Sequence, residues 1–171
     1  MASSEMTAAP DIRLRGKESS SNGRLEARGG MGARIALEIL IVVNAVAFLG
    51  ASLIHFGFAI PLGFATLADA ALPQAAAAEG AIGVAFVVAA AAVFARSGWA
   101  WGATLVAYLL GVLGVLIGLS VSVGDADLSS SANFWFHLTI LPVVLIGLGL
   151  LLTRGGRVGL GKAPADPEVR P

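Results

Sequence analysis

The sequence predicts an all-α integral membrane protein, built as a four-helix bundle with a tail at each end. Three observations indicate this class. Hydrophobic residues make up 57% of the 171 residues, charged residues only 13%, and the mean hydropathy is +0.85. A soluble domain carries about 25% charged residues and could not bury this much apolar surface. The apolar residues also gather in four long runs, with the basic residues gathered outside them.

The two ends of the chain differ from the middle in composition. Residues 1–31 are rich in serine, glycine, alanine and mixed charge, with too few large apolar residues to offset the entropy of ordering. We therefore expect a disordered cytoplasmic tail, which is too long and too acidic for a cleaved signal peptide. Residues 32–153 form the expected membrane domain. Residues 154–171, with three prolines, form a second, shorter cytoplasmic tail.

The four apolar runs cover about residues 35–60, 75–95, 99–123 and 132–152. Each reaches the roughly 20 residues that a helix rising 1.5 Å per residue needs to cross the hydrocarbon core. The runs are apolar on all sides and do not alternate, which disfavours both soluble amphipathic helices and β-barrel strands. Because backbone groups in lipid must be satisfied within the segment, each run is expected to be a helix.

Prolines mark two irregular places. The connection at residues 57–74 is largely apolar and contains Pro61 and Pro73, so we expect a short interfacial or partly re-entrant helix near residues 61–71. Pro142 lies inside the fourth run, where it removes one backbone donor. A kink is expected there.

The basic residues indicate the orientation. All eleven lysines and arginines lie before or at the start of the first run, in the turn that contains Arg96, or after the fourth run. With four crossings these places share one side, which the positive-inside tendency makes cytoplasmic. The opposite side carries Asp69, Asp125 and Asp127. The prediction is a multi-pass protein of the plasma (inner) membrane with both termini in the cytoplasm.

Small residues along the third run predict close helix packing. Gly111, Gly114 and Gly118 recur at steps of three and four, so they share one helix face. Gly114 and Gly118 form a GxxxG pair, which lets a neighbouring helix approach closely. Packing inside the bundle explains this pattern. A homo-oligomer or a larger membrane complex is the alternative.

Three ionisable residues lie at one depth on three different runs. They are His55, Glu79 and His137, and counting residues puts each about 5–8 Å below the outer boundary. The two histidines are the only ones in the chain. A charged group within the membrane is costly and usually turns inward to find a partner. We therefore expect a shared polar pocket, which Asn44 extends from nearly the same helix face as His55.

Several roles fit this group. Two imidazoles and a carboxylate form a partial ligand set for a divalent metal such as zinc, and two histidines could ligate a haem. A desolvated carboxylate beside histidines could exchange protons, as in a proton-coupled transporter subunit. The residues could also simply hydrogen-bond between helices, where such bonds contribute about 0.6 kcal/mol on average.

The leading prediction is a non-enzymatic binding or accessory subunit with an outward-facing polar pocket formed by His55, Glu79 and His137. A metal- or haem-dependent redox enzyme using the same groups is the alternative. The chain lacks cysteine and the sequence signatures of soluble hydrolases and nucleotide-binding enzymes. Its zero net charge gives no sign of a nucleic-acid partner, and the lipid bilayer is the expected surrounding. The layout resembles that of many small bacterial inner-membrane proteins.

Overall fold

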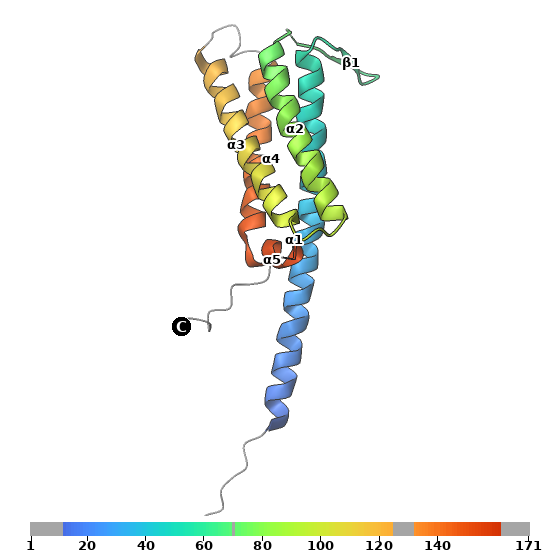
Figure 1. The fold of residues 1–171 in the computed structure, drawn as a ribbon, viewed down its shortest axis with the longest axis vertical. Helices are drawn as coiled ribbons and strands as arrows, with labels where there is room; N and C mark the ends of the chain where they lie inside the picture. Colours follow the sequence, from blue (N-terminus) through green and yellow to red (C-terminus); the bar gives the residue numbers. More distant parts are fainter. Residues whose placement is uncertain (1–11, 70, 125–131, 162–171) are drawn as a thin grey trace, which may run out of the picture.

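The computed structural model describes residues 12–69, 71–124 and 132–161. Within these residues four long helices pack side by side as an all-α bundle, which confirms the predicted fold class (Figure 1). Each contains a stretch of 20 to 27 residues that is apolar enough to cross a membrane. The helices are α1 (Ile12–His55), α2 (Pro73–Phe94), α3 (Ala100–Gly124) and α4 (Ala132–Leu152).

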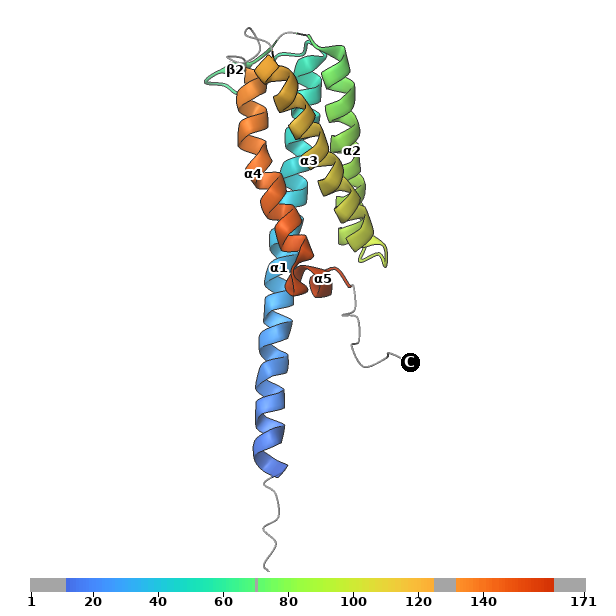
Figure 2. The same cartoon turned by 90° about the vertical axis from the view of Figure 1, so that its left-hand side faces the viewer.

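The first helix is longer than the sequence predicts. Because α1 begins at Ile12, residues 12–31 are helical where disorder was expected, and the helix continues well beyond the bundle (Figures 1 and 2). The physical reason is that a helix already nucleated in the bundle gains further residues without a new nucleation step. Residues 1–11 of the predicted tail lie outside the described residues.

The bundle has two chemically different ends. We call the first the hairpin end, where α1 finishes at His55, α2 begins at Pro73 and a small β-hairpin lies beside them (Figure 1). We call the other the arginine end, which contains Arg34, Arg96 and Arg154. Of the three aspartates predicted for the side opposite the basic residues, Asp69 lies at the hairpin end. The other two, at positions 125 and 127, lie outside the described residues.

The connection between α1 and α2 is a hairpin, which corrects the expected interfacial helix near residues 61–71. Strands β1 (Ile60–Pro61) and β2 (Thr66–Leu67) pair antiparallel, with Ile60 opposite Leu67. Gly63 turns the chain with a φ of +83°. Such a positive φ favours glycine and breaks a helix, and proline removes a helical donor, so this segment folds back as strands instead.

A fifth, short helix lies at the arginine end, where a tail was expected to begin. Helix α5 (Arg154–Gly159) starts at the N-cap Thr153, whose hydroxyl accepts a hydrogen bond from the Gly156 N–H at 3.0 Å. It packs against α1, and an added Cβ at Gly159 would lie 2.7 Å from the Gly30 carbonyl oxygen. The glycines of α5 therefore let its backbone pack closely on α1. The prediction that a tail begins at residue 154 did not anticipate this helix.

The glycine face of α3 points into the bundle. An added Cβ at Gly111 would lie 3.2 Å from Phe86 of α2 and 3.3 Å from Val144 of α4. An added Cβ at Gly114 would overlap the end of the Ile82 side chain. These glycines therefore serve packing within the bundle, and a homo-oligomer stays a prediction.

The outer surface of the bundle suits a lipid environment. Large apolar side chains such as Val46, Leu113 and Ile146 are exposed on three different helices. Helix α4 continues through Pro142, and the kink stays a prediction.

Candidate functional site

Three ionisable side chains converge at the hairpin end. His55 is the last residue of α1, and Glu79 and His137 lie in the second turns of α2 and α4. The His55 Nδ1 atom lies 2.7 Å from Glu79 Oε2, and His137 Nε2 lies 3.9 Å from Glu79 Oε1. All three side chains are only 3–5% exposed. The structure thus brings together the three residues that their shared depth had singled out.

The orientation of His137 follows from its backbone contact. Its Nδ1 atom lies 2.8 Å from the Asn133 carbonyl oxygen, one turn earlier in α4. A carbonyl oxygen can only accept, so Nδ1 carries the proton and donates. In the neutral ring Nε2 then presents a lone pair, and this atom lies 3.9 Å from Glu79 Oε1.

The space between His137 and Glu79 is a gap between two acceptors. Glu79 Oε1 is buried and has no hydrogen-bond partner within the described part of the chain. A separation of 3.9 Å from His137 Nε2 is too long for a direct hydrogen bond. Buried polar atoms normally have a partner, so this carboxylate oxygen is free to accept a hydrogen bond from a ligand or a water.

Gly118 of α3 makes room for the His137 ring. An added Cβ at Gly118 would overlap the imidazole, with its closest approach at Nε2. The GxxxG pair thus has a second role that its spacing did not reveal, because Gly118 determines where His137 can lie.

A second layer of polar groups joins α3, α4 and the hairpin. Asn133 donates through Nδ2 to Ser122 Oγ at 3.2 Å, and Ser122 donates to the Gly118 carbonyl at 2.9 Å. The Asn133 backbone N–H donates to Asp69 Oδ2 at 3.1 Å, so the hairpin satisfies a donor at the start of α4. Sequence reasoning treated Asp69 as a loop charge and missed Asn133 and Ser122. Their signal was a spacing of four residues from His137 and Gly118.

Asn44 does not join this cluster. Its side chain is fully buried, but its Nδ2 donates to the Leu40 carbonyl of the same helix at 2.7 Å. The eleven residues that separate it from His55 correspond to about 16 Å along the helix. Asn44 shares the helix face as predicted and lies too deep to complete the site.

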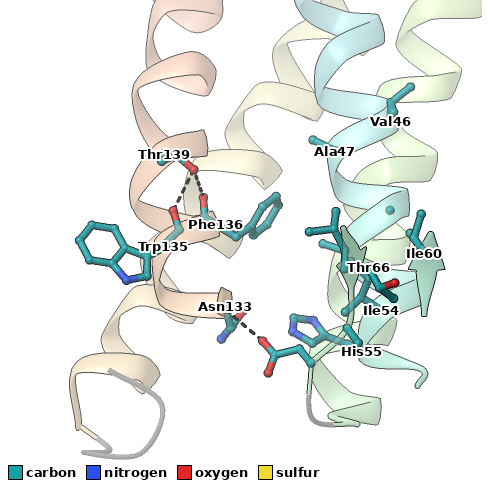
Figure 3. A pocket seen from close by; sticks show the side chains of 15 residues that line it. Val46, Ala47, Ile54, His55, Ile60, Thr66, Asn133, Trp135, Phe136 and Thr139 are labelled. Carbon is teal, nitrogen blue, oxygen red and sulfur yellow. Dashed lines mark hydrogen bonds between the residues drawn. The ribbon is translucent and has the colours of Figure 1, made fainter. Parts of the chain in front are cut away.

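One cavity borders the cluster on the side of α1 and α4. It has a volume of about 700 Å³ and reaches His55, the hairpin and the start of α4. Figure 3 shows His55 directed from α1 toward α4 and Phe136 directed from α4 toward α1, across this space. Trp135 lines the cavity with part of its surface, and its ring extends outward from α4.

A second cavity borders the cluster on the side of α2 and α3. It has a volume of about 560 Å³, and its wall includes Glu79, His137 and Gly118. Most of its other lining residues are apolar, among them Ile82 and Val121. The two facing acceptors of the cluster therefore adjoin a largely apolar cavity near one end of the bundle.

Aromatic rings lie below the cluster, toward the middle of the bundle. Phe48 and Phe86 stack with ring centroids 5.9 Å apart, and Tyr108 meets Phe86 edge-on at 5.1 Å. Phe48 is seven residues before His55 and Phe86 is seven residues after Glu79, which is about 10 Å along a helix. All three rings are almost completely buried. They form an aromatic layer, which includes the buried Tyr108 hydroxyl, between the cluster and the arginine end.

The geometry does not favour the metal site that the sequence suggested. Among the residues described, no group of three histidine, cysteine, aspartate or glutamate side chains is arranged to hold a metal ion. The 2.7 Å between His55 Nδ1 and Glu79 Oε2 is a hydrogen-bond distance. Two ligands each about 2.0–2.2 Å from one tetrahedral zinc would stand farther apart. The haem alternative stays a prediction.

Comparison with protein-family models, with curated proteins and with solved structures finds no match for this chain. What the site can do is therefore argued from its own geometry, within a protein whose four apolar helices make it a small membrane protein.

Proposed function

We propose that this is a plasma-membrane binding or accessory subunit that holds the polar head of an amphiphilic small molecule at the cluster of His55, Glu79 and His137. One observation carries the proposal: two buried acceptors, Glu79 Oε1 and His137 Nε2, face each other across 3.9 Å beside a largely apolar cavity of about 560 Å³. A ligand that fits must satisfy the acceptors and fill the cavity.

The two acceptors specify the head group. His55 engages the other carboxylate oxygen of Glu79, and the Asn133 carbonyl engages the other ring nitrogen of His137. The atoms left for a ligand therefore both need a hydrogen-bond donor. A primary ammonium group provides one N–H for each, whereas a hydroxyl has a single O–H and an ether or ester has none. The apolar lining of the cavity suits an alkyl chain. The ligand class is a primary amine with an apolar tail.

Binding is favoured over conduction by the packing below the cluster. The almost completely buried rings of Phe48, Phe86 and Tyr108 lie between Glu79 and the arginine end. A proton-coupled transporter subunit would need a polar path through this layer or a movement of it. A site that ends at an aromatic floor is suited to holding a ligand.

The orientation is part of the proposal. We propose that the hairpin end faces outward and that both termini are cytoplasmic, supported by Arg34, Arg96 and Arg154 at one end and Asp69 at the other. The chain has no cysteine, so single cysteines can be introduced and labelled cleanly. Phe64→Cys on the exposed hairpin should react with an impermeant maleimide on intact cells. Ser97→Cys should react only after permeabilisation, and the reverse pattern would contradict the orientation.

The binding proposal can be tested at His137 itself. Only two histidines are present, so nitrogen NMR of histidine-labelled full-length protein in nanodiscs gives two ring systems, which His55→Gln assigns. Titration with dodecylamine should shift the His137 Nε2 resonance, because the ammonium group donates to it. Methyl dodecyl ether, which has the same tail but no donor, should not produce that shift.

Glu79→Gln is the decisive variant. It removes the carboxylate charge that the ammonium group would pair with, so added dodecylamine should shift the resonance much less. Glu38→Gln removes a carboxylate from the same protein outside the cluster and should titrate like the wild type. Equal shifts with the amine and the ether, or an unchanged titration in Glu79→Gln, would refute the proposal.

A further inference from the structure

A small basic pocket lies at the arginine end, which is the end of the bundle opposite the histidine cluster. Its volume is about 290 Å³. Three separate parts of the chain build it: α1, the turn between α2 and α3, and α5. The lining residues that carry the argument are Arg34, Arg96, Ser97, Gly98, Val158 and Gly159.

Arg34 is held in place by two contacts. Its Nε donates to Glu38 Oε1 at 2.7 Å, and its Nη2 donates to the Val93 carbonyl at 3.2 Å, near the end of α2. Its side chain is 26% exposed. A guanidinium has further N–H donors beyond these two, so Arg34 is a preorganised cation with donors remaining for a ligand.

Arg96 occupies a backbone position that normally belongs to glycine. Helix α2 ends with Ser97 N–H donating to the Ala92 carbonyl at 2.9 Å and Arg96 N–H donating to the Val93 carbonyl at 3.1 Å, which is the Schellman pattern. Arg96 itself has a φ of +52°, in the left-handed region where residues other than glycine are strained. Strain of this kind concentrates where a side chain is needed for function.

The charge at this pocket is unbalanced. Glu38 pairs with Arg34, and Arg96 has no ion pair with any residue that the structure describes. Helix α5 contributes one wall of the pocket through its tight glycine contact with α1, and both arginines line the same space. A pocket with two guanidinium groups suits a phosphate, which arginine binds through paired N–H donors.

We propose that this pocket binds the phosphate of an anionic phospholipid. Two large apolar side chains flank the turn: Phe94 is 58% exposed and Trp99 is 56% exposed, at the helix ends where a bilayer would meet water. Tryptophan favours that interface, and basic pockets between membrane helices suit anionic head groups. Exposed rings beside the arginines favour a phosphate that carries acyl chains over a free phosphate ion.

Native mass spectrometry of the detergent-solubilised full chain tests the proposal. The protein is titrated in parallel with short-chain phosphatidylglycerol, short-chain phosphatidylcholine and inorganic phosphate. We expect phosphatidylglycerol to bind in preference to the other two. Arg96→Gln should weaken its binding about tenfold, which corresponds to the loss of one hydrogen bond to a charged group.

Two variants keep the test sharp. Arg157→Gln makes the same charge change at an exposed residue that does not line the pocket, and phosphatidylglycerol binding should be nearly unaffected. Arg96→Gly removes the guanidinium, and glycine suits the positive φ. This variant should therefore fold and still bind phosphatidylglycerol about tenfold more weakly than the wild type. An equal loss in Arg157→Gln would mean that diffuse surface charge attracts the lipid, and the pocket proposal would be overturned. Binding of inorganic phosphate as strong as that of the lipid, or no preference over phosphatidylcholine, would overturn the lipid assignment.

Discussion

The hydrogen bond between His55 and Glu79 gives the most direct test of the cluster. We consider a double-mutant cycle with His55→Ala, Glu79→Ala and the double variant, each compared with the wild type. The free energy of coupling is the part of the destabilisation that the two single changes share. A matched cycle pairs Glu79→Ala with His137→Ala.

The structure separates the expected magnitudes of the two cycles. Hydrogen bonds to charged groups contribute about 1.5–3 kcal/mol in general, whereas polar pairs between membrane helices average about 0.6 and reach about 1.7 kcal/mol. The His55–Glu79 contact is 2.7 Å long and both side chains are at most 5% exposed, so we expect a coupling near the upper membrane value, about 1.5 kcal/mol. The His137–Glu79 distance of 3.9 Å exceeds hydrogen-bond length, so its coupling should stay below about 0.5 kcal/mol.

The free energy of unfolding can be measured in mixed micelles by titration with a denaturing detergent, followed by tryptophan fluorescence. All variants are compared in the same detergent series and at one pH. If the His55 cycle gives less than about 0.3 kcal/mol, or if the His137 cycle gives the larger value, the assigned contacts are wrong.

Three further changes test the surrounding architecture. Gly118→Ala should lower the free energy of unfolding by about 1–3 kcal/mol, because its Cβ would overlap His137. Gly149→Ala in α4, where an added Cβ meets nothing within 4 Å, should be neutral or mildly stabilising. Equal effects of the two variants in detergent unfolding would contradict the close contact at Gly118. Asp69→Ala should cost about 1 kcal/mol because the first turn of α4 loses an acceptor, and Asp69→Asn, which keeps an acceptor, should retain most of that stability in the same assay. Arg96→Gly should raise the unfolding free energy by about 1 kcal/mol in a zwitterionic detergent, since it relieves a φ of +52°; a loss of stability there would show that the side chain itself holds the turn.

Part of the site could be read from the sequence. Each apolar run fixes where a helix starts in the membrane, so counting residues gives the depth of His55, Glu79 and His137. The structure brings these three together. Counting also gives the depth of Asn44. It lies about 16 Å deeper along α1 than His55, so sharing a helix face with His55 does not bring it to the cluster.

Other features had no readable signal. The hairpin of β1 and β2 depends on glycine conformations that composition does not distinguish from those of a short interfacial helix. Helix α5 is rich in glycine and would not form by propensity alone; its contact with α1 compensates for that. The role of Arg96 depends on a backbone angle, which residue identity does not reveal.

The sequence by itself determined that the chain is a bundle of four helices long and apolar enough to span a membrane. Each run is apolar on all sides and long enough to cross the bilayer, and a helix satisfies its backbone hydrogen bonds within the lipid. The tertiary structure alone decided which oxygen of Glu79 meets which histidine, why Gly118 cannot carry a side chain, and how Arg34 and Arg96 come to share a pocket. The physical reason is that hydropathy encodes the position of a residue along its own helix. The direction in which its side chain points depends on how all the helices rotate and pack together.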